Sequence, residues 1–239
     1  MASTQYSFER REEKYFLTPV QYEAILTPLR QHMHADEHEQ YTICSLYCDT
    51  PDWQLIRASL EKPYYKEKLR VRSYGTPAQD AEVFAEIKKK CEGVVYKRRI
   101  SAPVSAVQMD LRLAALNEGG QIGREIAWFQ QVNRTKPRVF LAYDRTAFAA
   151  ADDPSVRITF DKNIRWRTTA LDLCAGSAGC PLLPDGRILM ELKLPGVCPL
   201  WLSRLLAEVG AYPTSFSKYG EFYCTQVLGK TNKEARYSA

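Results

Sequence analysis

The sequence of 239 residues lacks a long apolar run, and none approaches the ~20 residues that a membrane-spanning helix needs. Its start, Met-Ala-Ser-Thr-Gln-Tyr, has none of the regions of a signal peptide. The seven cysteines contain no Cys-x-x-Cys pair, and the three histidines fall within residues 31–40, without zinc-ligand spacing. We therefore predict a cytoplasmic protein with reduced thiols, and a Cys174–Cys180 disulfide is the main alternative.

A strong charge of one sign is also missing. The net charge is +5, from 33 basic and 28 acidic residues, which is too mild for a general nucleic-acid coat. Alternating charges on strands form no recognition helix, so sequence-specific nucleic-acid binding is not expected. We see no linker and no solenoid repeat. The sequence predicts one domain over residues 1–239, with a core of about residues 6–228 and a polar C-terminal tail.

What the sequence does contain is a repeated alternation of charged and apolar residues. In a strand, Lys68, Arg70 and Arg72 share one face, while Leu69 and Val71 share the other. The opposite parity is largely apolar in most of these segments, as a half-buried strand requires. The same pattern recurs in residues 9–17, 84–90, 94–100, 139–145, 156–161 and 188–194.

Such strands indicate one of two arrangements. The charged faces could simply be solvated, or antiparallel strands could close into a barrel with a charged interior. Burying many cations costs several kcal/mol per ion unless an anion pairs with them. A chain of phosphates fits that need, because arginine and lysine match phosphate oxygens. The few glutamates would then hold Mg²⁺ or Mn²⁺.

Several local elements surround these strands. Thr18 and Pro19 predict a helix start, with an apolar stripe from Val20 to Met33. Thr50 and Pro51 predict a second one. Residues 168–186 are interpreted as a loop, mobile or lid-like at most.

Together these stretches resemble the VTC domain, the polyphosphate polymerase module of the vacuolar transporter chaperone family, within the triphosphate tunnel metalloenzymes. The likeness spans roughly residues 6–228. It is carried by Arg10-x-Glu12-x-Lys14-Tyr15, Ser45-Leu46-Tyr47-Cys48-Asp49-Thr50, Lys68-Leu69-Arg70-Val71-Arg72-x-Tyr74-Gly75, Glu86-Ile87-Lys88, Lys97-Arg98-Arg99, Tyr143-x-Arg145, Val156-Arg157-Ile158-Thr159-x-Asp161, Glu191-Leu192-Lys193 and Phe216-Ser217-Lys218-Tyr219.

The resemblance implies an α+β fold: an antiparallel eight-stranded β-barrel, the triphosphate tunnel, with helices packed on the outside. It implies a phosphotransferase that moves the γ-phosphate of ATP onto polyphosphate with Mn²⁺ or Mg²⁺, and pyrophosphate or orthophosphate are further candidate partners. The phosphate-sensing domain and membrane helices of eukaryotic members have no counterpart here, so a membrane-protein partner is left unknown. A lysine that the family often places before Phe-Ser-Lys is replaced by Thr214 and Ser215.

Site residues follow from the resemblance and from strand parity. Glu191 is the expected metal ligand, and Glu12 and Glu86 are weaker candidates because salt bridges explain them equally well. The expected catalytic side chains are Arg70, Arg72, Lys97, Arg145, Arg157 and Lys218. The expected substrate-binding side chains are Arg10, Lys14, Lys68, Lys88, Lys90, Arg99, Tyr143, Lys193 and Ser217.

Two other functions stay open. A hydrolase could cut triphosphate or polyphosphate in the same tunnel, and a non-catalytic module could bind polyphosphate without turnover. Both would need the same grip on phosphate.

Overall fold

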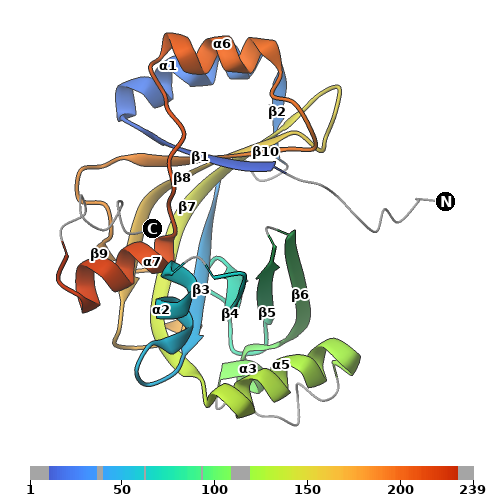
Figure 1. Ribbon diagram of the computed structural model, residues 1–239, viewed down its shortest axis with the longest axis vertical. Helices are drawn as coiled ribbons and strands as arrows, with labels where there is room; N and C mark the ends of the chain where they lie inside the picture. Colours follow the sequence, from blue (N-terminus) through green and yellow to red (C-terminus); the bar gives the residue numbers. More distant parts are fainter. Residues whose placement is uncertain (1–10, 37–39, 62, 93, 109–118, 231–239) are drawn as a thin grey trace. The chain divides into compact units, whose positions relative to one another are not determined.

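The computed structural model describes residues 11–36, 40–61, 63–92, 94–108 and 119–230. The expectations for Arg10, His38, the segment 109–118 and the C-terminal tail lie outside these residues. The described chain is α+β (Figure 1). Its strands are β1 (Arg11–Leu17), β2 (Met33–Ala35), β3 (Tyr41–Asp49), β4 (Tyr65–Tyr74), β5 (Glu82–Cys91), β6 (Val94–Pro103), β7 (Lys136–Ala150), β8 (Arg157–Arg167), β9 (Cys180–Pro181) and β10 (Ile188–Leu194).

The strands form one path in the order β1-β10-β8-β7-β3-β4-β5-β6, with β2 paired to β7 and β9 to β8. The path is open, since β1 and β6 are its two ends. Antiparallel pairing confirms the predicted fold class. The helices are α1 (Pro19–Leu29), α2 (Gln54–Leu60), α3 (Val104–Gln108), α5 (Gly120–Asn133), α6 (Leu200–Glu208) and α7 (Lys218–Phe222), with a 3₁₀ turn at Leu173–Ala175 and a π turn at Tyr223–Val227.

The chain divides into two compact units. The first unit contains residues 1–41, 144–163 and 183–215, and the second contains residues 42–143, 164–182 and 216–239. The boundary between the units falls inside strands β7 and β8, so each of these strands contributes residues to both units. The organisation as one domain stays a prediction. No helix in the described ranges is both long enough and apolar enough to cross a bilayer.

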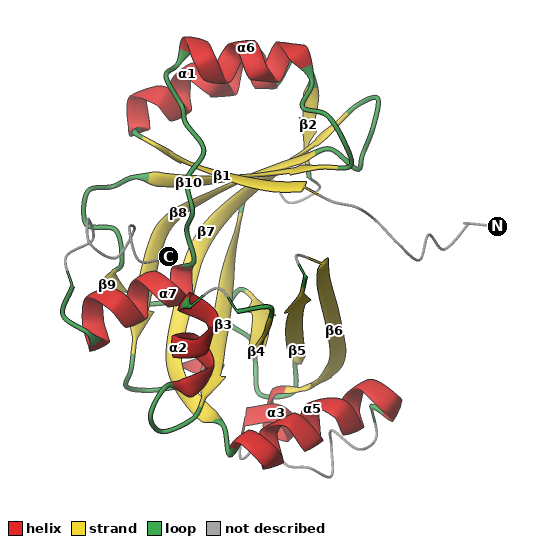
Figure 2. Ribbon diagram, in the orientation of Figure 1, coloured by secondary structure: helices red, strands yellow, loops and turns green. Residues whose placement is uncertain are grey.

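The first unit packs α1 and α6 against one face of its strands (Figure 2). Thr18 begins α1 as predicted, because its side chain and that of Gln21 form a reciprocal capping box. The predicted stripe is partly wrong. Ile25 is buried, but Val20 is 79% exposed and Met33 belongs to β2 instead. Val20 therefore faces away from the core of this unit, whereas Tyr22 in the same turn is buried in it.

The second unit is built on β3 to β6. The side chains of Leu46, Val71, Ala85 and Ile100, which are paired across the four strands, belong to its apolar core together with residues of α3 and α5. The charged residues at the alternate positions consequently share the opposite face.

Helix α2 starts later than predicted, at Gln54. Its backbone amides at Leu55 and Ile56 donate to the two carboxylate oxygens of Asp49, and the Gln54 amide donates to Thr50 Oγ1. Asp49 at the end of β3 thus binds the N-terminus of α2, which is where a carboxylate is stabilised.

Residues 168–186 are held more firmly than a mobile loop would be. Arg167 donates to the carbonyl oxygens of four loop residues, at 2.7 to 3.0 Å, and Leu173 and Leu182 are buried. The expectation of a mobile loop is therefore wrong, because the guanidinium of Arg167 donates hydrogen bonds to carbonyl oxygens along the loop. Cys174 and Cys180 are free thiols, so the alternative of a disulfide is not supported.

Candidate functional site

The second unit presents three cross-strand rows of polar side chains, which we name the basic face. One row is Tyr47, Arg70, Glu86 and Arg99, a second is Ser45, Arg72, Phe84 and Ser101, and a third contains Lys68, Lys88 and Lys97. Paired residues of antiparallel strands lie side by side on one face. The strand register therefore brings seven residues of the predicted site or of its metal candidates together in this unit: Lys68, Arg70, Arg72, Glu86, Lys88, Lys97 and Arg99.

Glu86 is the centre of the basic face. Its side chain is 1% exposed and lies 2.7 Å from Arg70 Nε, 2.6 Å from Lys97 Nζ and 3.9 Å from Arg72 Nε. Burial would raise the pKa of Glu86, but the surrounding cations outweigh it and lower the pKa to about 2. Three cations around one carboxylate leave an excess of positive charge at this point.

Neutral side chains orient the two arginines. Arg70 donates to the Tyr47 hydroxyl at 3.2 Å, while Arg72 donates to the Tyr143 hydroxyl at 3.3 Å and to Ser45 Oγ at 3.4 Å. Burial would raise the pKa of Tyr47, but Arg70 and Arg72 together lower it below its ordinary value. Arg70 is thus held by the Tyr47 hydroxyl as well as by Glu86, and Arg72 is held by two hydroxyl groups.

The Phe-Ser-Lys-Tyr segment joins the basic face from the C-terminal end of the chain. Ser217 begins α7, where its hydroxyl accepts from the Gly220 amide and from Lys68 Nζ at 3.2 Å. Lys218 Nζ lies 4.5 Å from the centroid of the Tyr143 ring. The next residue, Tyr219, donates to Asp49 at 2.6 Å. Tyr143, Ser217 and Lys218 therefore lie beside the basic face, and their roles in binding phosphate stay a prediction.

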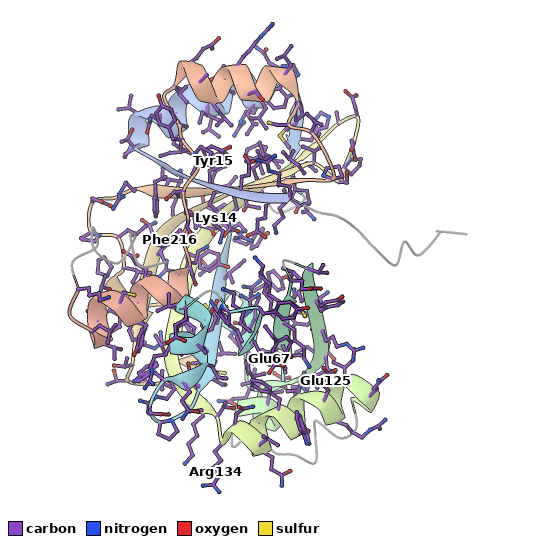
Figure 3. The ribbon with its side chains drawn as sticks, in the orientation of Figure 1. Lys14, Tyr15, Glu67, Glu125, Arg134 and Phe216 are labelled. Carbon is purple, nitrogen blue, oxygen red and sulfur yellow. The ribbon has the colours of Figure 1, made fainter. Side chains whose placement is uncertain are left out.

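The first unit carries a second charged group, which we name the mixed cluster and define as Lys14, Arg145, Asp161 and Glu191. Arg145 binds both oxygens of Asp161, at 2.6 and 2.8 Å, and Glu191 at 3.1 Å. Lys14 Nζ lies 4.0 Å from Glu191. Lys14 and Tyr15 extend to opposite faces of β1 (Figure 3), and Tyr15 joins the apolar core of the unit. The charged and apolar faces of the first unit are thus separated.

The other predicted residues lie near these two groups. Glu12 contacts Lys14 at 3.6 Å, and Arg157 contacts Asp36 at 2.7 Å. Lys193 is paired with Glu12 and Arg157 across the strands of the first unit. Lys90 lies one row beyond Lys88, paired with Lys66 and Val95.

Candidate metal ligands differ in how well their surroundings fit a divalent cation. In the described ranges, no three histidine, cysteine, aspartate or glutamate side chains form a ligand group. Magnesium often binds one or two carboxylates and completes its shell with substrate phosphates. Glu191 is 9% exposed, its closer contact is Arg145 at 3.1 Å, and Lys14 lies 4.0 Å away, so this single carboxylate fits that mode. Glu86, enclosed by three cations, fits the salt-bridging alternative better.

Sequence reasoning assigned no role to Ser45, Tyr47, Asp49 or Asp161. All four stand in the alternating segments at the parity of predicted site residues or in the quoted motifs. Parity was therefore the available signal, and only the structure shows that Ser45, Tyr47 and Asp161 contact arginines while Asp49 binds the amides of α2 and the Tyr219 hydroxyl.

Comparison with solved structures shows a shared fold. A candidate adenylyl cyclase from Hippeastrum, described as having a dominant triphosphatase activity, is 16% identical with a TM-score of 0.54, covering 92% of this chain and 96% of its own. A candidate adenylate cyclase from Vibrio parahaemolyticus is 14% identical with a TM-score of 0.50, covering 91% and 99%. One from Bacillus halodurans is 12% identical with a TM-score of 0.51, covering 86% and 92%.

No curated protein matches the chain. The model of the VTC domain matches residues 9–226, which is most of the sequence. Both units contribute residues to that match. The chain therefore belongs to the VTC domain family.

Proposed function

We propose that this protein is a polyphosphate polymerase that transfers the γ-phosphate of ATP to the end of a polyphosphate chain. The observation that carries the proposal is the convergence of Arg70, Arg72 and Lys97 on Glu86. A buried excess of oriented cations is stabilised by a polyanion, and forked guanidinium groups match phosphate oxygens. Membership in the VTC domain family supports the same substrate class.

The chemistry needs little covalent help from the protein. A terminal oxygen of the acceptor phosphate forms a bond to the γ-phosphorus, while the bond to the bridging oxygen breaks and its electron pair leaves with ADP. The acceptor is already an anion near neutral pH, so no general base is required. The arginines and lysines align the phosphates and neutralise their charge. When bound at Glu191, Mg²⁺ or Mn²⁺ would supply further neutralisation of phosphate oxygens.

The test is incubation of the purified protein with ATP and Mn²⁺ or Mg²⁺, followed by electrophoresis that resolves long polyphosphate. We expect polymer from the wild type. Arg70→Ala and Glu191→Ala should each lower the rate by about 10²–10³-fold, the typical loss of one transition-state contact. Arg124→Ala on α5 and Glu208→Ala on α6 remove exposed charges and serve as matched controls.

Product analysis separates the alternatives. Free phosphate without polymer would support a triphosphate or polyphosphate hydrolase, and the Hippeastrum neighbour is described as having triphosphatase activity. Tight phosphate binding without turnover would support a binding module. Polymer formation that survives both Arg70→Ala and Glu191→Ala would contradict the roles proposed for these residues.

A further inference from the structure

Thr159 on β8 is a buried polar residue without a partner in the described protein. It is 5% exposed, and its hydroxyl oxygen has no hydrogen-bond partner within the described ranges. Buried hydroxyl groups in native proteins are almost always paired, so an unpaired one calls for a physical explanation.

The strand register places Thr159 in the mixed cluster. Thr159 is paired with Glu191, which is paired in turn with Lys14. Its neighbours Ile158 and Phe160 belong to the apolar core of the first unit. Alternation therefore directs the Thr159 side chain to the same face as the charged groups.

The missing partner has a definable chemistry. Lys14 and Arg145 already supply donors to this face, and a guest that uses them together with the Thr159 hydroxyl must offer several acceptor oxygens. A phosphate group offers three, and a hydroxyl adds a directional contact without burying another charge. The carboxylate of Glu191 is an immediate neighbour, yet the hydroxyl is not bonded to it.

We propose that the Thr159 hydroxyl donates a hydrogen bond to a phosphate oxygen of the substrate at the mixed cluster. The inference rests on the proposed function for the identity of this guest. Lys14 Nζ lies 3.6 Å from Glu12 and 4.0 Å from Glu191, longer than the 2.6 to 3.1 Å contacts of Arg145, and such long ion pairs are readily exchanged for phosphate contacts. Thr159 is then a substrate-binding residue in addition to those predicted from the sequence.

Thr135 offers a matched control. It is also buried, and its hydroxyl likewise lacks a partner in the described ranges, but it belongs to the second unit, next to the start of β7 and outside both charged groups. Valine replaces either threonine with nearly the same shape and removes only the hydroxyl, whereas serine keeps the hydroxyl.

The experiment measures tripolyphosphate binding by calorimetry, with and without Mg²⁺, and the thermal midpoint Tm of the ligand-free protein. Thr159→Val should raise Tm by about 2–4 °C, because an unpaired buried hydroxyl is lost. It should also weaken tripolyphosphate binding by about 10- to 100-fold, the value of a hydrogen bond to a charged group. Thr159→Ser should restore binding to within about 3-fold, and Thr135→Val should raise Tm without changing binding.

Other outcomes overturn the inference. Binding in the presence of Mg²⁺ that is unchanged in Thr159→Val would show that the hydroxyl touches no phosphate, and a clear drop in Tm would assign Thr159 a structural role. If Thr159→Ser binds tripolyphosphate as weakly as Thr159→Val does, the methyl group of Thr159, and not its hydroxyl, supports binding. If the wild type binds tripolyphosphate but makes no polymer, the polymerase proposal fails and the Thr159 contact stands. If it does not bind at all, both fail.

Discussion

The carboxylate of Glu86 should contribute more to folding stability than any exposed charge. Replacing it with glutamine tests whether its negative charge stabilises the basic face when no phosphate is bound. The folded protein lowers the pKa of Glu86 from 4.5 to about 2. A difference of ~2.5 pKa units corresponds to about 3 kcal/mol of folding stability at pH 7. Because the side chain is 1% exposed, solvent screening reduces this value little.

The sign of the pH dependence follows from the lowered pKa. A carboxylate whose pKa is depressed by folding stabilises the protein above its unfolded pKa of 4.5, and this contribution is lost as the pH falls toward 2. Glutamine resembles the protonated acid, so Glu86→Gln should cost about 3 kcal/mol at pH 7 but only about 1 to 1.5 kcal/mol at pH 3.

Urea denaturation of wild type and Glu86→Gln at pH 7, 5 and 3 measures these differences directly. Glu208→Gln on α6 is the control, because an exposed carboxylate should change stability by less than about 0.5 kcal/mol. Tripolyphosphate should stabilise the Glu86→Gln variant more than the wild type, because in the variant no carboxylate competes with phosphate for Arg70, Arg72 and Lys97. A loss that is equal at pH 7 and pH 3 would refute the electrostatic reasoning.

Four further predictions concern the rest of the molecule. Asp161→Asn should replace the carboxylate that binds Arg145 at two positions with a neutral amide, leaving Glu191 as the anionic contact, and lower the free energy of unfolding by about 3 kcal/mol, measured by urea titration with the wild type at equal pH. Tyr219→Phe should cost about 1 to 2 kcal/mol in the same assay, because the carboxylate that binds the N-terminus of α2 loses a donor. Gly179→Ala should lower Tm clearly, because its new Cβ would lie 2.6 Å from a backbone oxygen of β8; an unchanged Tm would contradict this close approach. Mg²⁺ should tighten tripolyphosphate binding to the wild type but not to Glu191→Ala, as measured by calorimetry with and without EDTA. An equal gain in affinity from Mg²⁺ in both proteins would show that Glu191 holds no metal.

Strand parity predicted which residues share a face, because it depends only on neighbours in the sequence. Lys68, Arg70 and Arg72 indeed share one face of β4, and Leu69 and Val71 lie in the core. Parity could not show that Glu86 lies beside Arg70, because that contact depends on the register between two strands. The antiparallel fold was therefore predictable, whereas the ion pairs were not.

The errors in local structure have the same origin. Val20 fits a helical stripe, but the orientation of α1 is set by its packing on α6 and the strands. Thr50 and Pro51 resemble a helix start. The carboxylate of Asp49, however, accepts hydrogen bonds from the N-terminal amides of α2 and from the distant Tyr219 hydroxyl, and these contacts fix the start of the helix at Gln54. Contacts between residues far apart in the sequence decided both outcomes.

The two charged groups differ in formal charge, and this difference predicts different binding properties. On the basic face, Arg70, Arg72 and Lys97 surround one carboxylate, so phosphate binding there reduces the local charge excess without help from a metal. The mixed cluster pairs two cations with two carboxylates and is formally neutral. A phosphate alone would make it negative, and a divalent cation on Glu191 would offset that change. Phosphate binding should therefore be largely metal-independent in the second unit and metal-coupled in the first.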